Sequence, residues 1–243
     1  MAMTSEPRDD TGDAGIPARL KEVQERIRAA AVRAKRTPEG IELLAVSKTH
    51  GADAIRTAYA CGQRAFGESY VQEALGKMVL LEDLDITWHF IGRVQANKTR
   101  QVAAHFHWVH GLADPAHARR LNDQRPADLP PLKVCVQVNL SGEASKAGLE
   151  PSAVAALIAE CETLPALQVC GLMTLPAPAQ DEEAQRRPFR TLRVLRDQLA
   201  TPTRPLRCLS MGMSDDLEAA ILEGATLVRV GTAVFGPRPY NTK

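Results

Sequence analysis

Eight short apolar runs alternate with helical segments along almost the whole chain, and this alternation limits the possible folds more than any other feature. Several of the runs are apolar throughout, which is typical of strands that are covered on both faces. The stretches between them are long enough to hold a helix, as connections between parallel strands require. The expected strands occupy residues 41–47, 64–67, 87–92, 108–112, 133–140, 167–175, 207–211 and 226–231.

The expected helices fill the intervals between these strands, and one more precedes the first strand. In this first helix, 19–35, the residues Leu20, Val23 and Ile27 recur with helical spacing, and a stretch with proline and glycine at 37–40 ends it. The other helices are expected near 52–61, 69–80, 95–105, 115–124, 151–162, 181–199 and 215–223.

The number of units favours a closed barrel over an open doubly wound sheet. The chain has 243 residues, and a (β/α)₈ barrel typically needs ~250. No Gly-x-Gly-x-x-Gly turn follows the first strand, which argues against a dinucleotide-binding sheet. We therefore predict an α/β protein with a single (β/α)₈ TIM-type barrel at 16–243, an extra N-terminal helix, and a disordered tail at 1–15.

Composition and charge do not point to a nucleic-acid or membrane partner. The net charge is +1 with 24% charged residues, which gives no indication of a nucleic-acid or membrane partner. No apolar run reaches the ~18 residues of a membrane span. The polar N-terminal stretch has no secretory signal, and the five cysteines are scattered without a C-x-x-C pair. Reduced thiols of this kind are typical of a cytoplasmic protein, so we expect that location.

Three histidines close together raise the question of a metal site. His105, His107 and His110 span the end of an expected helix and the following strand. Their side chains should therefore point in different directions, and no carboxylate nearby completes a set of ligands. We expect no metal in this protein.

Lys48 stands where the first strand ends, and the active sites of β/α barrels lie at these C-terminal strand ends. An amine held with its stem in apolar surroundings should have a pKa below the ordinary ~10.4, because desolvation disfavours the ammonium form. A neutral lysine amine can attack a carbonyl and form a Schiff base. The alternative interpretation is a lysine whose charged end reaches solvent at the barrel rim.

The last two strands end in residues that suit a phosphate. Ser210 and Ser214 precede a helix that Asp215 could cap, and Gly231 and Thr232 offer backbone amides after the eighth strand. Loops after strands seven and eight commonly form the phosphate site of this fold. Ordinary capping and a glycine turn would also explain the pattern. Together with the lysine, these residues suggest a ligand that carries both a phosphate and an aldehyde.

A set of segments then makes the chain similar to a known family. They occur in the same order as in that family and cover 18–240. The chain resembles the pyridoxal phosphate homeostasis proteins, which are related to the N-terminal barrel of alanine racemase. The segments that carry this resemblance are 43–49, 66–73, 88–92, 97–99, 137–139, 145–148, 171–173, 210–216 and 228–236.

The resemblance implies a cofactor and assigns residues to it. Pyridoxal 5′-phosphate (PLP) would be held as a Schiff base on Lys48. Its phosphate would contact Ser210, Gly231 and Thr232, and its pyridine nitrogen would face Arg229. Two positions differ from the family pattern, since Ser69 stands where asparagine is common and Arg93 where proline is frequent. These differences leave the implied PLP contacts intact.

The same resemblance implies a carrier and not an enzyme. Such proteins are thought to act in vitamin B6 homeostasis, to be largely monomeric, and to buffer PLP or deliver it to apo-enzymes. The residues themselves favour PLP binding, without indicating a recipient. No catalytic residue is assigned.

Two other functions remain possible at this point. A weak PLP-dependent amino-acid racemase would need a second acid or base on the opposite face of the cofactor. Tyr70 is a candidate, although a packing role suits it better, and racemases add a C-terminal domain for which the chain has no room after the barrel. A Schiff-base aldolase that acts on a sugar phosphate would use the same lysine without PLP. Lys146, in an expected loop, could take up a second PLP or be an ordinary solvated lysine.

Overall fold

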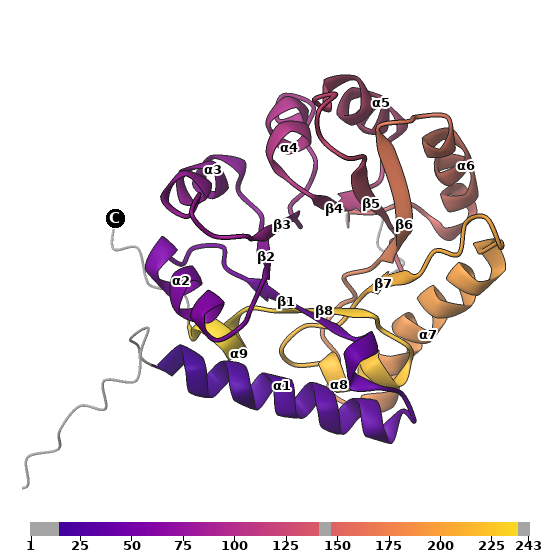
Figure 1. The fold of residues 1–243 in the computed structure, drawn as a ribbon. Coiled ribbons are helices and arrows are strands. Elements are labelled where there is room, and N and C mark those ends of the chain that lie inside the picture. Colours follow the sequence, from indigo (N-terminus) through magenta and orange to yellow (C-terminus); the bar gives the residue numbers. More distant parts are fainter. Residues whose placement is uncertain (1–14, 141–146, 238–243) are drawn as a thin grey trace, which may run out of the picture.

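The strands close into a parallel barrel in the order in which they occur along the chain (Figure 1). This computed structural model describes residues 15–140 and 147–237. The first and last strands pair in parallel, so that Leu44 of β1 lies beside Arg229 of β8. The predicted (β/α)₈ barrel is confirmed. Its strands are β1 (Glu42–Val46), β2 (Ala65–Glu68), β3 (Thr87–Phe90), β4 (Trp108–Leu112), β5 (Leu132–Gln137), β6 (Leu167–Met173), β7 (Cys208–Ser210) and β8 (Leu227–Val230).

Helices surround this barrel, and the extra N-terminal helix is present. It is α1 (Ile16–Arg33), which packs against the last two helices and follows the β1–β8 side of the barrel (Figure 1). The short α9 after the last strand was not expected. The remaining helices are α2 (Ala52–Ala60), α3 (Val71–Leu80), α4 (Thr99–His105), α5 (Pro115–Gln124), α6 (Pro151–Glu162), α7 (Glu182–Leu199), α8 (Leu217–Leu222) and α9 (Thr232–Phe235), with a 3₁₀ turn at Pro38–Gly40.

The expected periodicity of α1 explains why it packs as it does. Leu20, Val23 and Ile27 are buried on one stripe. Each such side chain contributes about 1.5–3 kcal/mol when it is removed from water. The predicted disordered tail lies outside the described residues, apart from Gly15.

The interior of the barrel is filled with small and medium side chains and a few polar ones. Leu44, Cys135, Met173 and Cys208 belong to an apolar cluster inside it. Gly171 of β6 is required by the pairing with β7, because a Cβ atom there would lie 1.8 Å from the carbonyl oxygen of Cys208. The interior is therefore a packed core, and a ligand can enter only at an end.

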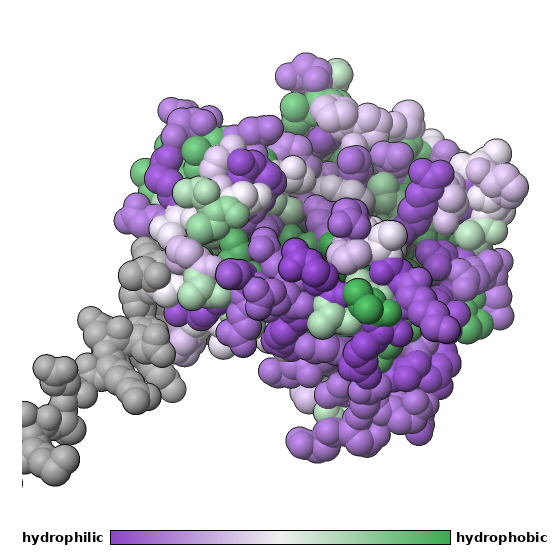
Figure 2. All heavy atoms as spheres, turned by 60° about the horizontal axis from the view of Figure 1, so that its bottom comes forward, coloured by the Kyte–Doolittle hydropathy of each residue, from purple (hydrophilic) through white to green (hydrophobic). Residues whose placement is uncertain are grey.

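The surface that includes α1 is largely hydrophilic, with scattered apolar residues (Figure 2). Val32 of α1 is an exposed apolar residue, with 67% of its surface accessible. In the part of the chain that the structure describes, every helix is too short or too polar to cross a membrane.

Candidate functional site

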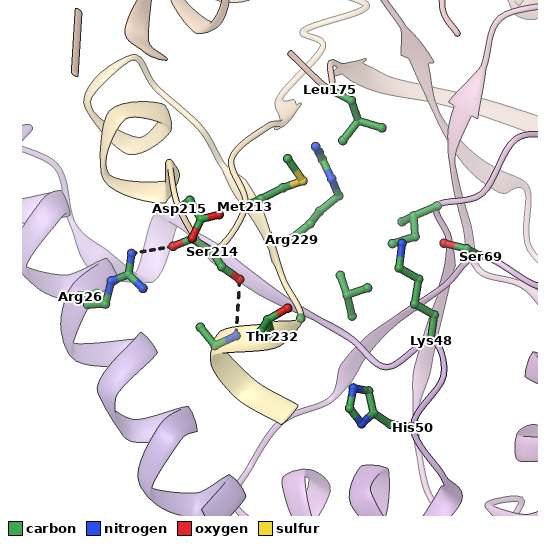
Figure 3. A pocket seen from close by; sticks show the side chains of 14 residues that line it. Arg26, Lys48, His50, Ser69, Leu175, Met213, Ser214, Asp215, Arg229 and Thr232 are labelled. Carbon is green, nitrogen blue, oxygen red and sulfur yellow. Dashed lines mark hydrogen bonds between the residues drawn. The ribbon is translucent and has the colours of Figure 1, made fainter. Parts of the chain in front are cut away.

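A cavity of about 460 Å³ opens at the C-terminal ends of the strands (Figure 3). This is the end of the barrel at which β/α barrel proteins bind ligands. The residues that line it come from the ends of β1, β2, β3 and β8, from the loops after β6 and β7, and from α1 and α9. They are Arg26, Val46, Lys48, His50, Ser69, Ile91, Leu175, Met213, Ser214, Asp215, Arg229, Gly231, Thr232 and Ala233.

Lys48 projects into this cavity two residues after the end of β1 (Figure 3). It is partly buried, and the residue before it, Ser47, is fully buried. The backbone on both sides of Lys48 is held from α3. The Nζ atom of Lys77 donates to the carbonyl oxygen of Ser47 at 2.8 Å, and the carboxylate of Glu73 accepts from the amide of Thr49 at 2.6 Å.

The groups that hold this backbone form one ion cluster, in which Lys77 and Glu68 are buried and Glu73 is partly exposed. Lys77 Nζ lies 2.7 Å from a carboxylate oxygen of Glu68 and 2.5 Å from one of Glu73. Ser47 Oγ donates to the same oxygen of Glu68 at 2.7 Å. Burial raises the pKa of Glu68 even though Lys77 and Ser47 favour its charged form. The cluster fixes the end of β1 to the first turns of α3.

Thr49 carries backbone strain beside Lys48. Its φ angle is +69°, in the left-handed region that β-branched residues rarely adopt. The hydrogen bond from its amide to Glu73 helps to hold that conformation. Strain of this kind persists where the surroundings over-determine the backbone, and it often accompanies functional positions.

Arg229 reaches the cavity from inside the barrel. It is 4% exposed, and its guanidinium donates to Ser210 Oγ at 2.7 Å and to the carbonyl oxygen of Thr174 at 2.9 Å. Burial lowers the pKa of Arg229 to about 10, so the side chain is still a cation at neutral pH. A buried cation therefore forms part of the floor of the cavity.

Hydroxyl and amide groups line the wall near the start of α9. Ser214 Oγ accepts from the amide of Ala233 at 3.5 Å, and Thr232 lies beside them (Figure 3). Gly231 packs closely on β1, because a Cβ atom there would lie 3.3 Å from the carbonyl oxygen of Val46. These groups suit an anion.

The loop before α8 is closed by Asp216 and not by Asp215. Asp216 is the N-cap residue, and its carboxylate accepts from the amide of Met213 at 2.6 Å without capping the helix itself. The expectation that Asp215 caps this helix was therefore wrong, because Asp216 occupies the N-cap position and its side chain makes no capping hydrogen bond. Asp215 lines the cavity instead.

The structure brings most of the predicted site residues together, with Ser210 as the exception. Lys48, Ser69, Arg229, Gly231 and Thr232 all line the cavity. Ser210 does not line it. Its side chain is fully buried in the barrel, because it is the last residue of β7 and its hydroxyl lies between Arg229 and a histidine. The cavity hydroxyl from this segment belongs to Ser214, in the loop after the strand.

Two polar lining residues were not recognised from the sequence. Arg26 belongs to α1, and its guanidinium donates to Glu218 and to the carbonyl oxygen of Ser214 at 2.8 Å. No local pattern distinguishes it from other polar residues of an amphipathic helix. His50 follows Lys48 closely and stacks on Phe235 with ring centroids 5.1 Å apart. Its position two residues after Lys48 could have indicated from the sequence that it lies near the site.

The other candidates lie elsewhere. Tyr70 is 56% exposed and lines a separate small cavity together with Arg93. The ring nitrogen Nδ1 of His107 accepts from the amide of Trp88, whereas His110 points into the barrel. Among the described residues no group of three or more histidine, cysteine or acidic side chains could hold a metal ion. Lys146 lies outside the described residues.

Comparison with known proteins assigns the chain to a family. The family model of the alanine racemase N-terminal domain matches residues 19–239. The pyridoxal phosphate homeostasis protein of Pseudomonas aeruginosa is 54% identical over 93% of this chain and 96% of its own length. The chain belongs to the pyridoxal phosphate homeostasis protein family. The family member of Escherichia coli K12 is 48% identical over 94% of this chain and 99% of its own length.

Solved structures agree with this family assignment. PipY of Synechococcus elongatus with PLP bound has a TM-score of 0.75 and 39% identity, and the match covers 88% of this chain and all of PipY. Alanine racemase from Corynebacterium glutamicum has a TM-score of 0.64 at 18% identity, and the match covers 92% of this chain and 63% of the racemase. The second likeness shows a shared barrel fold. The predicted resemblance to the homeostasis proteins is confirmed.

Proposed function

We propose that this protein binds PLP in the cavity and acts in intracellular PLP homeostasis, with Lys48 joined to the cofactor as a Schiff base. The observation that carries the proposal is the convergence of three groups on one cavity. Lys48 supplies an amine and Arg229 supplies a buried cation. The residues around Ser214 and Thr232 supply a wall of hydroxyl and amide groups. The names of the curated relatives and the PLP-bound structure of PipY support it.

The residues present fit the three functional groups of PLP. The Lys48 amine can hold the aldehyde. Gly231, Thr232 and Ser214 can bind the phosphate through amide and hydroxyl donors, and Ser214 takes the place that we had expected for Ser210. Arg229 can face the pyridine nitrogen and, as a cation, gives that nitrogen no carboxylate partner that would keep it protonated. Bound PLP would supply an electron sink, whose strength depends on whether the pyridine nitrogen is protonated.

Carriage and delivery to apo-enzymes suit the site better than turnover. Tyr70, the candidate for a second base, lies in another cavity and is largely exposed. The relatives are named as homeostasis proteins and not as enzymes. We infer a monomeric cytoplasmic protein that exchanges PLP with apo-enzymes transiently. Sedimentation of the purified protein and recovery of activity by an apo-enzyme mixed with the loaded protein test these points.

Weak amino-acid racemisation is the second candidate, because His50 also lines the cavity. An imidazole can move a proton near neutral pH. Exchange of the Cα proton of amino acids for deuterium, in the wild type and in His50→Gln, tests this candidate. Exchange that is lost in His50→Gln would favour the racemase, and an absence of exchange in the wild type would exclude it.

The test of the PLP proposal is covalent trapping. The wild type incubated with PLP and reduced with borohydride should carry one pyridoxyl group on the peptide that contains Lys48. Lys48→Ala should lose this adduct and its visible absorbance, whereas Lys98→Ala, a lysine of the separate small cavity, should keep both. A Lys48→Ala protein that still traps one equivalent of PLP would overturn the assignment of Lys48. A wild type that takes up no PLP would overturn the proposed function and favour the aldolase alternative.

A further inference from the structure

A chain of buried hydrogen bonds runs from Arg229 across the interior of the barrel. The Arg229 guanidinium donates to Ser210 Oγ at 2.7 Å, and the same oxygen lies 2.7 Å from Nδ1 of His110. Nε2 of His110 lies 2.9 Å from Nδ1 of His89. The side chain of His89 then stacks on Trp108, with ring centroids 5.4 Å apart and the planes 6° from parallel. Four strands contribute to this chain, β8, β7, β4 and β3.

The members of this chain are shielded from water. His89, His110 and Ser210 have no exposed surface, and Arg229 is 4% exposed. Buried polar groups without partners are costly, so the protons on this chain must be arranged to leave as few groups unmatched as possible. Within the described residues, Nε2 of His89 has no hydrogen-bond partner.

Counting donors and acceptors sets the direction of the chain. Arginine can only donate, so the oxygen of Ser210 accepts from Arg229. If the Ser210 hydroxyl then donates to Nδ1 of His110, Nε2–H of His110 donates to His89. Only the Nε2–H group of His89 is left unmatched. In the opposite direction, both the Ser210 hydroxyl proton and the Nε2 lone pair of His89 would lack partners.

Electrostatics favours the same direction. With Nδ1 of His110 as an acceptor, its lone pair faces the Ser210–Arg229 end of the chain, where the positive charge lies. In the opposite direction an N–H group of His110 and one of Arg229 would both point at one oxygen. Burial, followed by the charge of Arg229, lowers the pKa of His110 to about 3, so the ring is neutral as this arrangement requires.

We propose that His110 and Ser210 are positioning residues, which with His89 form a one-way hydrogen-bonded chain that fixes how the Arg229 guanidinium faces the cavity. The effect on the cofactor rests on the proposed binding of PLP there. Ser210 thus acts on the pyridine side of the site through Arg229, and not on the phosphate side. The orientation of Arg229 sets the contact with the pyridine nitrogen, so loss of the chain should change both PLP retention and the absorbance of the bound form.

The direction of the chain can be tested on the protein without any cofactor. Long-range ¹⁵N–¹H correlation spectra distinguish a protonated from an unprotonated ring nitrogen, and His110→Asn assigns the signals of this residue. We expect His110 and His89 to carry their protons on Nε2 only. A proton on Nδ1 of His110 would overturn the proposal, whether or not PLP binds.

The effect on the site is tested with matched variants. Ser210→Ala and His110→Leu remove the link to Arg229 and should weaken PLP binding roughly tenfold, with a shift in the absorbance of the bound form. His110→Asn places an amide oxygen near the position of Nδ1, so it should accept from Ser210 and restore both properties. Cys208→Ala removes an inward side chain of the same strand that lies outside the chain, and it should bind PLP as the wild type does.

The outcomes separate this proposal from the proposed function. Wild-type PLP binding together with unaltered binding and absorbance in Ser210→Ala and His110→Leu would overturn the role of the chain. If His110→Asn and Cys208→Ala lost PLP binding as strongly as Ser210→Ala and His110→Leu, the losses would come from a packing defect. That result would also overturn the role of the chain. A wild type that binds no PLP would overturn the proposed function, while the spectra of His110 would still decide the direction of the chain.

Discussion

Lys48 lies between two residues whose backbones are held by a buried lysine and by a carboxylate that pairs with this lysine. Lys77 contacts the residue before it, Ser47, and Glu73 contacts the residue after it, Thr49. A flexible lysine side chain is thereby attached to a fixed point at the rim of the barrel. The strained φ angle of Thr49 turns the chain sharply just after this point. Rigid attachment is what a site needs to hold a reactive amine in place.

Removing the buried cation should be strongly destabilising. Lys77→Met leaves Glu68 buried without its cation, and breaking a buried ion pair in this way typically costs about 3–5 kcal/mol in the free energy of unfolding. Urea unfolding measures this loss. The double variant Lys77→Met/Glu68→Gln should recover much of it, because no uncompensated charge remains. A loss of less than about 1 kcal/mol, as for a surface ion pair, would contradict the burial of this cluster.

His110 should make the protein sensitive to acid. Its folded pKa is about 3, mainly through burial, against an ordinary value of 6.5. Between these values the unfolded chain binds a proton that the folded chain excludes, so stability falls as the pH falls through this window. In His110→Asn the slope of unfolding free energy against pH, measured between about pH 4 and 6, should decrease by roughly 1.4 kcal/mol per pH unit. An unchanged slope would contradict the low pKa.

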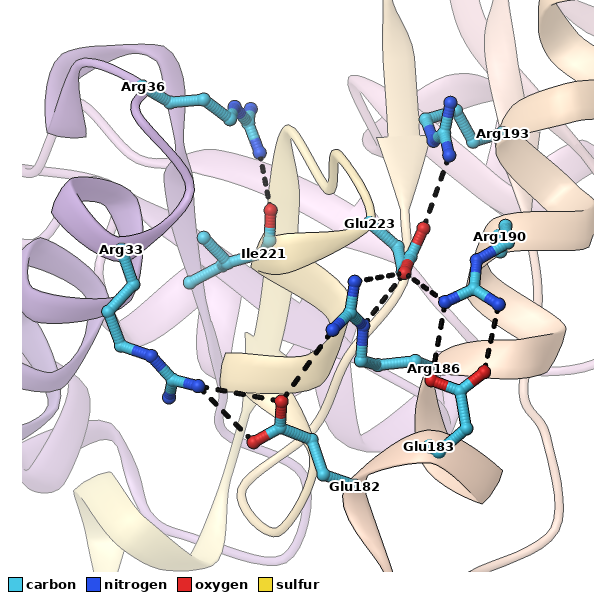
Figure 4. Close-up of polar contacts among 9 residues, drawn as sticks. All are labelled: Arg33, Arg36, Glu182, Glu183, Arg186, Arg190, Arg193, Ile221 and Glu223. Carbon is cyan, nitrogen blue, oxygen red and sulfur yellow. Dashed lines mark hydrogen bonds and ion pairs between the residues drawn. The ribbon is translucent and has the colours of Figure 1, made fainter.

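At the scale of elements, α7 and α8 are joined through one buried carboxylate (Figure 4). The side chain of Glu223, directly after α8, is 2% exposed and lies 2.7, 3.0 and 3.2 Å from Arg186, Arg190 and Arg193 of α7. Burial alone would raise the pKa of Glu223, but the hydrogen bonds from the three arginines outweigh it and lower the pKa. The contact fixes α7 beside the helix that follows the Ser214 loop.

Glu223→Gln should therefore cost about 3 kcal/mol in the free energy of unfolding, because three arginines lose their shared buried partner. Urea unfolding gives this number. Glu183→Gln is a matched control, since Glu183 also pairs with Arg190 but its side chain is 59% exposed. It should cost less than about 1 kcal/mol. Equal effects of the two changes would show that the cluster contributes no more than a surface ion pair.

The elements themselves were largely predictable, and the exceptions have physical causes. Each expected strand is present within about two residues at most ends, because apolar runs between turn residues define buried strands. The helix expected at 95–105 starts only at Thr99, after a turn at 95–98. The four-residue α9 is too short to show a periodic pattern of apolar residues in the sequence. It packs against α1 in the folded chain.

At the scale of the whole molecule, closure of the barrel creates the site. Lys48 and Arg229 are 181 positions apart in the sequence, yet β1 and β8 are paired neighbours. The cavity also takes Arg26 from the helix that packs across this junction. A ligand that contacts all three parts binds the folded chain and not the unfolded one. Its binding should therefore stabilise the entire barrel.

PLP should raise the melting temperature of the protein. At a free concentration of 100 times Kd, binding adds about 2.7 kcal/mol, which corresponds to roughly 5–10 °C for a chain of this size. Thermal unfolding followed with and without PLP measures the shift. Lys48→Ala should show a much smaller shift at the same PLP concentration. An equal shift in both proteins would indicate that PLP binds elsewhere.

The sequence alone determined the barrel, the extra helix and most residues of the candidate site. Apolar periodicity depends on neighbours in the chain, and strand ends in a parallel barrel must all meet at one rim. For that reason Lys48, Arg229, Gly231 and Thr232 could be placed from their order alone. Only the tertiary structure decided where Ser210 and Arg26 lie. The direction of a side chain at a strand end, and the helix that covers a barrel junction, depend on packing between residues far apart in the sequence.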